Sequence, residues 1–284
     1  MKDPQLLIRQ TGAVLAALPP PGHRLDRRRL ADQVTRFPHA LDSGPLPGLV
    51  IAVLAAADTI PPGLRSRAAW DAVGVDCDDL TGGLITIGVH PAGWVLPAGA
   101  SVTLPPRELA RCAWNPPPRQ GAWVFVTENP SVATAAADLA DTLPAGHEPV
   151  RLLCTSGTPS AREISAIARL ADAGWNVAVR ADFDEAGLNH VTALLTGIPG
   201  AVAWRMGAAE YLASLAAAPP GAEVTLGGGP LPTTPWDPRL HAAMADRRLA
   251  AYEETLVDDL LHDLRHPLEH PPSGETTPMA APEA

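Results

Sequence analysis

Three acidic residues stand where two apolar segments of the chain end. The run Trp123–Thr127 is followed at once by Glu128, and the run Trp175–Ala181 is followed by Asp182 and Asp184. Side chains alternate along an extended chain, so Asp182 and Asp184 share one face. If the two segments are neighbouring strands, the three carboxylates converge and repel each other unless a divalent cation is bound. Mg²⁺ and Mn²⁺ prefer such oxygen ligands, so the pattern indicates metal-dependent phosphoryl chemistry.

These acids can also be interpreted as helix caps. An aspartate in the turn between a strand and a helix often accepts a hydrogen bond from the first N–H groups of the helix. One such acid would be explained by capping, whereas three at matching positions favour a metal site. Glu185 follows in the first turn of the next expected helix, where the helix dipole alone favours an acid. We therefore interpret Glu185 as structural.

The segments that position the acids alternate regularly between strand and helix patterns. We expect strands at 122–127, 150–155, 175–181 and 201–204, and helices at 131–142, 160–173, 185–196, 207–216, 238–249 and 251–265. Such alternation predicts an α/β fold with a parallel sheet covered by helices on both faces. In the flavodoxin-like strand order 2-1-3-4, the first and third strands meet where the order reverses, which is where such sheets bind ligands. Those two strands end at Glu128 and Asp182.

The first third of the chain differs, because prolines interrupt it repeatedly. We expect short helices near 25–35, 46–57 and 64–73, strands at 84–89 and 102–104, and a helical turn at 107–112. The triple proline Pro116–Pro118 continues neither a helix nor a central strand, so it predicts a domain boundary. The expected organisation is a mixed α/β N-terminal region over 1–115, a catalytic domain over 120–266 and a disordered, proline-rich tail over 267–284.

Composition narrows the class of protein. The 284 residues are 46% hydrophobic, with a mean hydropathy of +0.05, which predicts a folded chain. The longest apolar run, Leu49–Ala57, is too short to span a bilayer, and no signal-peptide cleavage pattern follows the N-terminus. The three cysteines form no Cys-x-x-Cys pair. We therefore expect reduced thiols, no zinc site, no membrane association and a cytoplasmic location.

The charge of the chain bears on a nucleic-acid partner. The net charge of −10 argues against DNA binding, unless positive charge is concentrated locally. Arginines do cluster at Arg27, Arg28 and Arg29, while acids concentrate near 253–263. The arginine cluster is the candidate DNA-binding segment, and its alternative interpretation is a solvated helix face.

The acid pattern resembles the Toprim domain of topoisomerase VI A subunits and of related meiotic break-forming proteins. That domain has an acid after its first strand, a glycine-containing turn after its second, and Asp-x-Asp-x-x-Gly after its third. Here Glu128, the turn 154–159 and the segment Asp182–Gly187 match. The backbone of the second turn, at Ser156 and Gly157, is a candidate for positioning a phosphate.

A closer likeness is to the nuclease subunit of Wadjet-type plasmid-defence systems. The segments that carry it are Thr127–Pro130, Asp182–Asp184, Trp204–Gly207, Phe37–Asp42 and Arg67–Leu80, so the likeness covers residues 25–265. It implies a Toprim nuclease that acts as a homodimer on circular DNA with an SMC-type ATPase complex. Ala181 stands where glycine is expected, and the N-terminal region is shorter than in the family, which puts a DNA-positioning module there in doubt.

Tyrosines decide between strand passage and hydrolysis. A topoisomerase forms its phosphoenzyme through a tyrosine placed before the Toprim part, whereas the only tyrosines here, Tyr211 and Tyr252, follow the acids. Water is therefore the expected nucleophile. The sequence predicts a DNA endonuclease in which Glu128, Asp182 and Asp184 bind Mg²⁺ or Mn²⁺ and Glu128 also serves as a general base. The alternatives are a catalytically weak structural subunit of the same assembly, and a small-molecule phosphotransferase or nucleotide binder.

Overall fold

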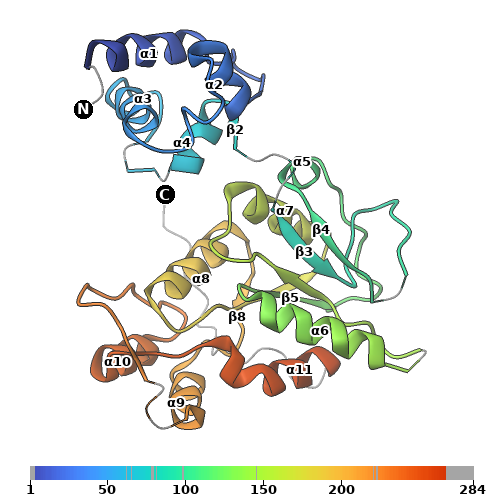
Figure 1. Ribbon diagram of the computed structural model, residues 1–284. Coiled ribbons are helices and arrows are strands. Elements are labelled where there is room, and N and C mark those ends of the chain that lie inside the picture. Colours follow the sequence, from blue (N-terminus) through green and yellow to red (C-terminus); the bar gives the residue numbers. More distant parts are fainter. Residues whose placement is uncertain are drawn as a thin grey trace, which may run out of the picture. The chain divides into compact units, whose positions relative to one another are not determined.

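The computed structural model describes residues 4–61, 63–64, 66–77, 80, 82–97, 99–144, 146–219, 221 and 223–266. The chain divides into two compact units, residues 1–81 and 82–284 (Figure 1). The tail over 267–284, predicted to be disordered, lies outside the described residues. Among the described helices, none combines the length and the apolar character needed to cross a bilayer.

The first unit is built mainly of helices. Its elements are α1 (Pro4–Ala16), β1 (Leu25–Asp26), α2 (Arg27–Thr35), α3 (Pro45–Ala56), α4 (Ser66–Ala72) and β2 (Val75–Asp76). The side chain of Asp26 caps α2 by accepting a hydrogen bond from the backbone N–H of Arg29 at 2.9 Å. Leu30, Val50 and Trp70 are fully buried in its core. The three helices predicted here are confirmed, and α1 was not predicted.

The second unit contains a six-stranded sheet in the order β4-β3-β6-β5-β7-β8. Its strands are β3 (Leu84–Ile87), β4 (Ser101–Leu104), β5 (Trp123–Thr127), β6 (Leu152–Cys154), β7 (Asn176–Val179) and β8 (Val202–Ala203). The last four are parallel to one another. In chain order these four follow the predicted arrangement 2-1-3-4, so β5 and β7 are neighbours.

The remaining two strands correct the predicted domain boundary. β3 pairs antiparallel with β6, with Ile85 opposite Cys154, and β4 pairs antiparallel with β3. These backbone hydrogen bonds make the segment before Pro116–Pro118 part of the same sheet. The boundary between the units lies between residues 81 and 82, well before the expected 115–120. The triple proline is therefore a connection within the second unit.

Helices cover both faces of this sheet. On one face lie α6 (Pro130–Thr142) and α11 (Val257–Arg265), and on the other lie α7 (Ala161–Asp172) and α8 (Glu185–Gly197) (Figure 1). Right-handed crossovers explain this division: the chain steps from β5 to β6 in one direction and from β6 to β7 in the other, so α6 and α7 fall on opposite faces.

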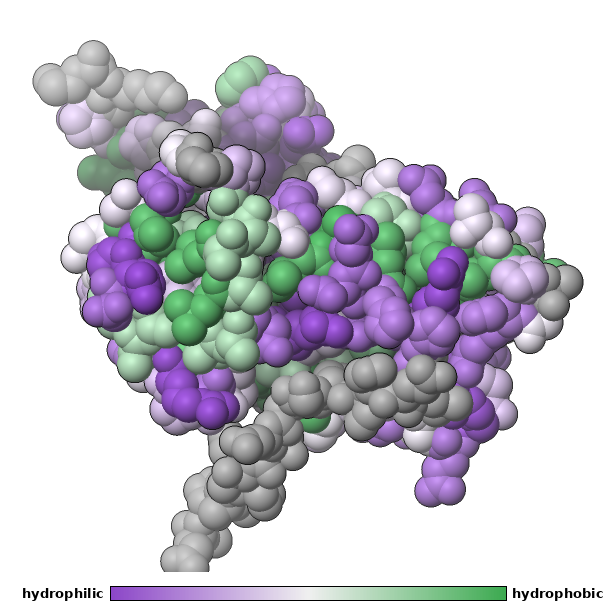
Figure 2. Space-filling model, turned by 90° about the horizontal axis from the view of Figure 1, so that it is seen from below, coloured by the Kyte–Doolittle hydropathy of each residue, from purple (hydrophilic) through white to green (hydrophobic). Residues whose placement is uncertain are grey.

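The C-terminal part of the second unit follows β8 in the chain. It contains α9 (Ala208–Ala217), β9 (Val224–Thr225), α10 (Pro238–Arg247) and β10 (Leu249–Ala250), and the short α5 (Pro106–Leu109) lies earlier in the chain. The helix predicted over 251–265 is divided into a 3₁₀ turn, η1 (Glu253–Leu256), and α11. Tyr252, expected in its apolar stripe, is 37% exposed, whereas Glu253 is fully buried. The surface seen from below carries a belt of polar residues beside apolar areas (Figure 2).

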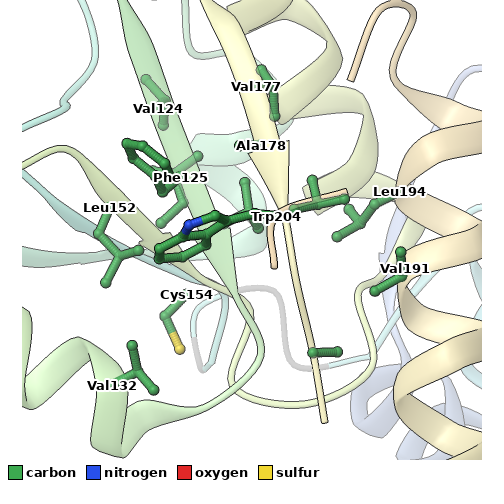
Figure 3. Close-up of a cluster of buried hydrophobic side chains, with 14 of the residues drawn as sticks. Val124, Phe125, Val132, Leu152, Cys154, Val177, Ala178, Val191, Leu194 and Trp204 are labelled. Carbon is green, nitrogen blue, oxygen red and sulfur yellow. The ribbon is translucent and has the colours of Figure 1, made fainter. Parts of the chain in front are cut away.

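Large aromatic side chains fill the core beneath the sheet. The rings of Phe125 and Trp204 lie 4.6 Å apart, among aliphatic side chains from β6, β7 and α8 (Figure 3). The indole N–H of Trp204 donates to Asp263 of α11 at 2.8 Å, and the same carboxylate pairs with Arg205 at 2.6 Å. These contacts anchor α11 to the sheet and fix the segment that precedes it.

Candidate functional site

The three acids lie at the same end of two neighbouring strands. Val126 of β5 is opposite Val179 of β7, so both strands end at the same edge of the sheet. Glu128 follows β5 directly, and Asp182 and Asp184 lie between β7 and α8. The strand neighbours that the sequence predicted are thus the ones that carry the acids.

Burial and neighbouring negative charges disfavour the charged forms of Glu128 and Asp182. Burial raises the pKa of Glu128 to about 7, and the charges of Asp182, Glu253 and Asp184 add to the effect. Burial also raises the pKa of Asp182 to about 7, with contributions from Glu253, Glu254 and Asp184, although a hydrogen bond from the backbone of Glu253 opposes the rise. A cation bound at this edge would relieve both penalties.

Each acid makes one further contact. Glu128 Oε2 lies 3.6 Å from Nδ1 of His190. Asp182 Oδ1 accepts a hydrogen bond from the backbone N–H of Glu253 at 2.7 Å. Asp184 Oδ1 accepts one from the N–H of Gly187, also at 2.7 Å, and so caps α8. The capping interpretation therefore holds for Asp184, and it leaves lone pairs of that carboxylate for another ligand.

Glu128, Asp182 and Asp184 lie at the same edge of the sheet, which we call the acid edge. Within the described part of the chain, no three His, Cys, Asp or Glu side chains are gathered closely enough to make a ready-made metal cage. Mg²⁺ in phosphoryl-transfer sites is usually held by one or two carboxylates together with water and substrate phosphates. The carboxylate oxygens at this edge, together with the raised pKa values of Glu128 and Asp182, fit an ion held in that way.

A buried ion pair that the sequence analysis missed supports the acid edge. Arg180 Nε donates to Glu253 Oε1 at 2.7 Å, and neither side chain is exposed. Glu253 also accepts hydrogen bonds from the Thr127 hydroxyl at 2.8 Å and from the Asn129 N–H at 3.0 Å. Through its own N–H it holds Asp182. Glu253 thereby ties the ends of β5 and β7 to η1.

A second residue that the sequence analysis missed is His190. It lies on the buried face of α8, and its side chain is 0% exposed. Burial lowers its pKa to about 4, so the imidazole is neutral at neutral pH. Its position three residues after Gly187 and four before Leu194, both buried, is the helical spacing that could have identified it.

The turn after β6 is held against the acid edge. The N–H of Gly157 donates to the carbonyl oxygen of Glu128 at 3.3 Å, and Ser156 is exposed with a φ of +51°. The Gly157 N–H is thus engaged within the protein. Binding of a phosphate by Ser156 and Gly157 stays a prediction.

The arginine cluster occupies the first turn of α2 in the first unit. Arg27 pairs with Asp42 at 2.8 Å, and its side chain is 14% exposed, so its charge is used within the unit. Arg28 lies 3.7 Å from the same carboxylate and is exposed, as is Arg29. The two exposed arginines are the members available to a DNA phosphate.

Two family models match the chain. The model described as "Protein of unknown function C-terminus (DUF2399)" matches residues 102–264, and "Protein of unknown function N-terminus (DUF3323)" matches residues 2–91. No curated protein matches. The first model covers more than half of the chain, including the three acids, His190 and the Arg180–Glu253 pair. The chain therefore belongs to the family of proteins defined by the DUF2399 C-terminal region.

Proposed function

We propose that this chain is a metal-dependent DNA endonuclease whose second unit is a Toprim-type catalytic domain. The observation that carries the proposal is the acid edge: Glu128 and Asp182 follow neighbouring parallel strands, and burial with neighbouring negative charges raises the pKa of each to about 7. A fold that only needed caps at these positions would gain nothing from bringing such acids together. The motif likeness to Wadjet-type nuclease subunits supports the same assignment.

Each part of the edge has a role in phosphodiester hydrolysis. Glu128, Asp182 and Asp184 would hold the ion. A bound Mg²⁺ or Mn²⁺ supplies charge stabilisation at the scissile phosphate and at the leaving 3′ oxygen. Glu128 would also serve as the general base that accepts a proton from the attacking water. Arg180 and Glu253 position Asp182 and the end of β5.

Water is the nucleophile that fits this site. Tyr211 is buried, and its hydroxyl donates to the carbonyl of Leu249 at 2.8 Å, which gives it a structural role. Tyr252 is exposed and follows the acids in the chain. Hydrolysis needs no phosphoenzyme, so replacing Tyr252 by phenylalanine should leave cleavage intact.

The likeness to Wadjet-type systems extends the proposal to partners. It implies a homodimer, with one acid edge for each DNA strand, acting in the cytoplasm beside an SMC-type ATPase complex against plasmid DNA. The alternative of a structural subunit shares that assembly. The alternative of a small-molecule enzyme gains no support from the pocket of about 260 Å³ between α6 and α11, because its lining residues, Leu139, Asp258, Leu261, His262 and Arg265, include none of the three acids.

A plasmid cleavage assay with Mg²⁺ or Mn²⁺ tests the proposal. The full chain should nick or linearise supercoiled DNA, and Glu128→Gln, Asp182→Asn and Asp184→Asn should each reduce cleavage to background. Glu185→Gln is the matched control, because Glu185 is an exposed acid in the first turn of α8, next to the site in sequence. It should cleave like the wild type.

Three other outcomes would change the assignment. A folded wild-type chain that cleaves with neither ion would favour the structural subunit. Cleavage at the wild-type rate by Asp184→Asn would remove that residue from the site. Loss of cleavage in Tyr252→Phe would indicate a covalent intermediate in place of direct hydrolysis.

A further inference from the structure

The imidazole of His190 presents a nitrogen without a partner to the acid edge. Its side chain is fully buried, and Nδ1 has no hydrogen-bond partner among the described residues. Buried polar atoms are normally hydrogen-bonded, so each exception needs a physical explanation. The atom that faces His190 Nδ1 is Oε2 of Glu128, at 3.6 Å.

The other ring nitrogen faces a hydroxyl group. His190 Nε2 lies 3.4 Å from the hydroxyl oxygen of Thr155, and that oxygen lies 3.5 Å from the carbonyl oxygen of Thr127. A neutral imidazole carries its proton on one nitrogen only. With that proton on Nε2, towards the Thr155 oxygen, the lone pair of Nδ1 faces a carboxylate oxygen. Two lone pairs in a buried site repel each other unless a positive charge lies between them.

The separation distinguishes a proton from a metal ion. A hydrogen bond between a carboxyl group and Nδ1 would need a distance of about 2.7–3.2 Å. Two atoms that ligate one ion at about 2.1 Å lie roughly 3.0 Å apart in octahedral and roughly 3.4 Å apart in tetrahedral geometry. The observed 3.6 Å is too long for the hydrogen bond and is close to the spacing of two ligands of one ion.

We propose that His190 is a nitrogen ligand of the ion bound at Glu128. This inference rests on the proposed function, because it assigns a further ligand to the same acid edge. Thr155 then has the role that a carbonyl or hydroxyl usually has behind a metal-bound imidazole: it accepts the distal N–H and fixes the orientation of the ring. The acids alone would make an all-oxygen site, and His190 converts it into a mixed oxygen and nitrogen site.

This mixed donor set changes which ions the site selects. Mg²⁺ and Ca²⁺ take oxygen ligands almost exclusively, whereas divalent ions of the first transition series also accept imidazole. The site should therefore bind Mn²⁺ more tightly than Mg²⁺. The difference in affinity between Mn²⁺ and Mg²⁺ should decrease when His190 is replaced by a residue without an aromatic nitrogen.

Electron spin-echo spectroscopy of the full chain with Mn²⁺ tests the ligand directly. The echo of wild-type protein titrated with MnCl₂ should show modulation from a directly bound ¹⁴N nucleus, and labelling the histidines with ¹⁵N should change it. His190→Gln should lose the modulation and weaken Mn²⁺ binding by about tenfold or more, with a smaller change for Mg²⁺. His262→Gln is the matched control, because His262 is an exposed helical histidine on α11, and it should behave like wild type.

The outcomes separate this inference from the proposed function. Tight Mn²⁺ binding that is weakened by Asp182→Asn, without any nitrogen modulation, would overturn the role of His190 and leave the acid site standing. Failure of the wild type to bind Mn²⁺ would overturn both. Modulation that persists in His190→Gln and disappears in His262→Gln would assign the nitrogen to α11. The proposal can still be overturned if His190→Gln does not fold, because a wild-type spectrum without modulation that responds to ¹⁵N-histidine contradicts it.

Discussion

Two acids at one edge of the sheet, the fully buried Glu253 and the partly buried Glu128, differ in their partners. Glu253 pairs with the buried Arg180 and accepts two more hydrogen bonds, from Thr127 and Asn129. Glu128, which directly follows β5, faces only the neutral ring of His190, and no arginine or lysine pairs with it among the described residues. The fold thus neutralises the carboxylate that contacts Thr127 and Asn129, and it leaves the carboxylate of Glu128, the residue between them, without a counter-charge.

This difference indicates that the positive charge that balances Glu128 must come from outside the protein. A buried charge without a partner costs several kcal/mol, and proteins either pair it or shift its pKa. Glu253 is paired, whereas the pKa values of Glu128 and Asp182 are both raised to about 7. We interpret the first acid as structural and the other two as a site completed by a cation from solution.

The largest change in the free energy of unfolding is expected when the ion pair between Arg180 and Glu253 is broken. Arg180→Met leaves Glu253 buried without a counter-charge, so it should lower the free energy of unfolding by about 3–5 kcal/mol. Urea denaturation at pH 7 with EDTA measures this. The double variant Arg180→Met, Glu253→Gln should recover part of the loss, because no uncompensated charge is left. If Arg180→Met lowered the free energy of unfolding no more than Glu128→Gln does, Glu253 could not be distinguished from Glu128 as a structural acid.

The acids without counter-charges should make stability depend on pH. Their folded pKa values, about 7, exceed the ordinary values near 4, so the folded state holds protons that the unfolded chain has released. Their contribution is therefore fully present below pH 4 and is lost as the pH rises through 7. The slope should reach at most about 1.4 kcal/mol per pH unit for each group.

Metal-free unfolding measured from about pH 4 to about pH 9 checks this dependence. The wild type should lose stability relative to the Glu128→Gln, Asp182→Asn double variant as the pH rises. Above pH 8 the difference should level off. Parallel profiles for the two proteins would show that the acids are neutralised within the fold.

The smallest effect, a change in the salt dependence of DNA binding, is expected from substitutions in the first unit. Arg28 and Arg29 are exposed, whereas Arg27 is paired with Asp42. If the exposed pair contacts DNA, Arg28→Ala with Arg29→Ala should reduce the slope of log affinity against log salt by about 0.9 for each lost phosphate contact. Binding should be measured with Ca²⁺ present. An unchanged slope would show a solvated helix face, with DNA delivered by another chain.

The sequence predicted those features that depend on local pattern. The strand and helix alternation from residue 122 onward, the neighbouring positions of β5 and β7 and the acid edge all follow from periodicity and from the rule for parallel sheets. The pairing of β3 with β6 was missed, because the triple proline was interpreted as a boundary. Proline prevents regular hydrogen bonding at its own position, but it does not prevent earlier strands from joining the sheet.

The residues that support the site could not be read from local pattern alone. Arg180 at the end of an apolar strand and Glu253 in an acid-rich segment each look like surface residues. Their burial depends on contact between positions 73 residues apart in the chain. His190 could have been identified from the sequence, because its helical spacing places it on the buried face of α8. Its proposed role depends on its proximity to Glu128 and Thr155, which only the tertiary structure shows.

The unfolding free energy in the presence of Mn²⁺ tests the central claim most directly, namely that the acid edge binds a divalent cation. An ion that binds only the folded state at 100 times its dissociation constant should stabilise the wild type by about 2.7 kcal/mol. Glu185→Gln should show the same gain, and Asp182→Asn should lose most of it. An equal gain in wild type and Asp182→Asn would place the ion elsewhere, and no gain in the wild type would contradict the account.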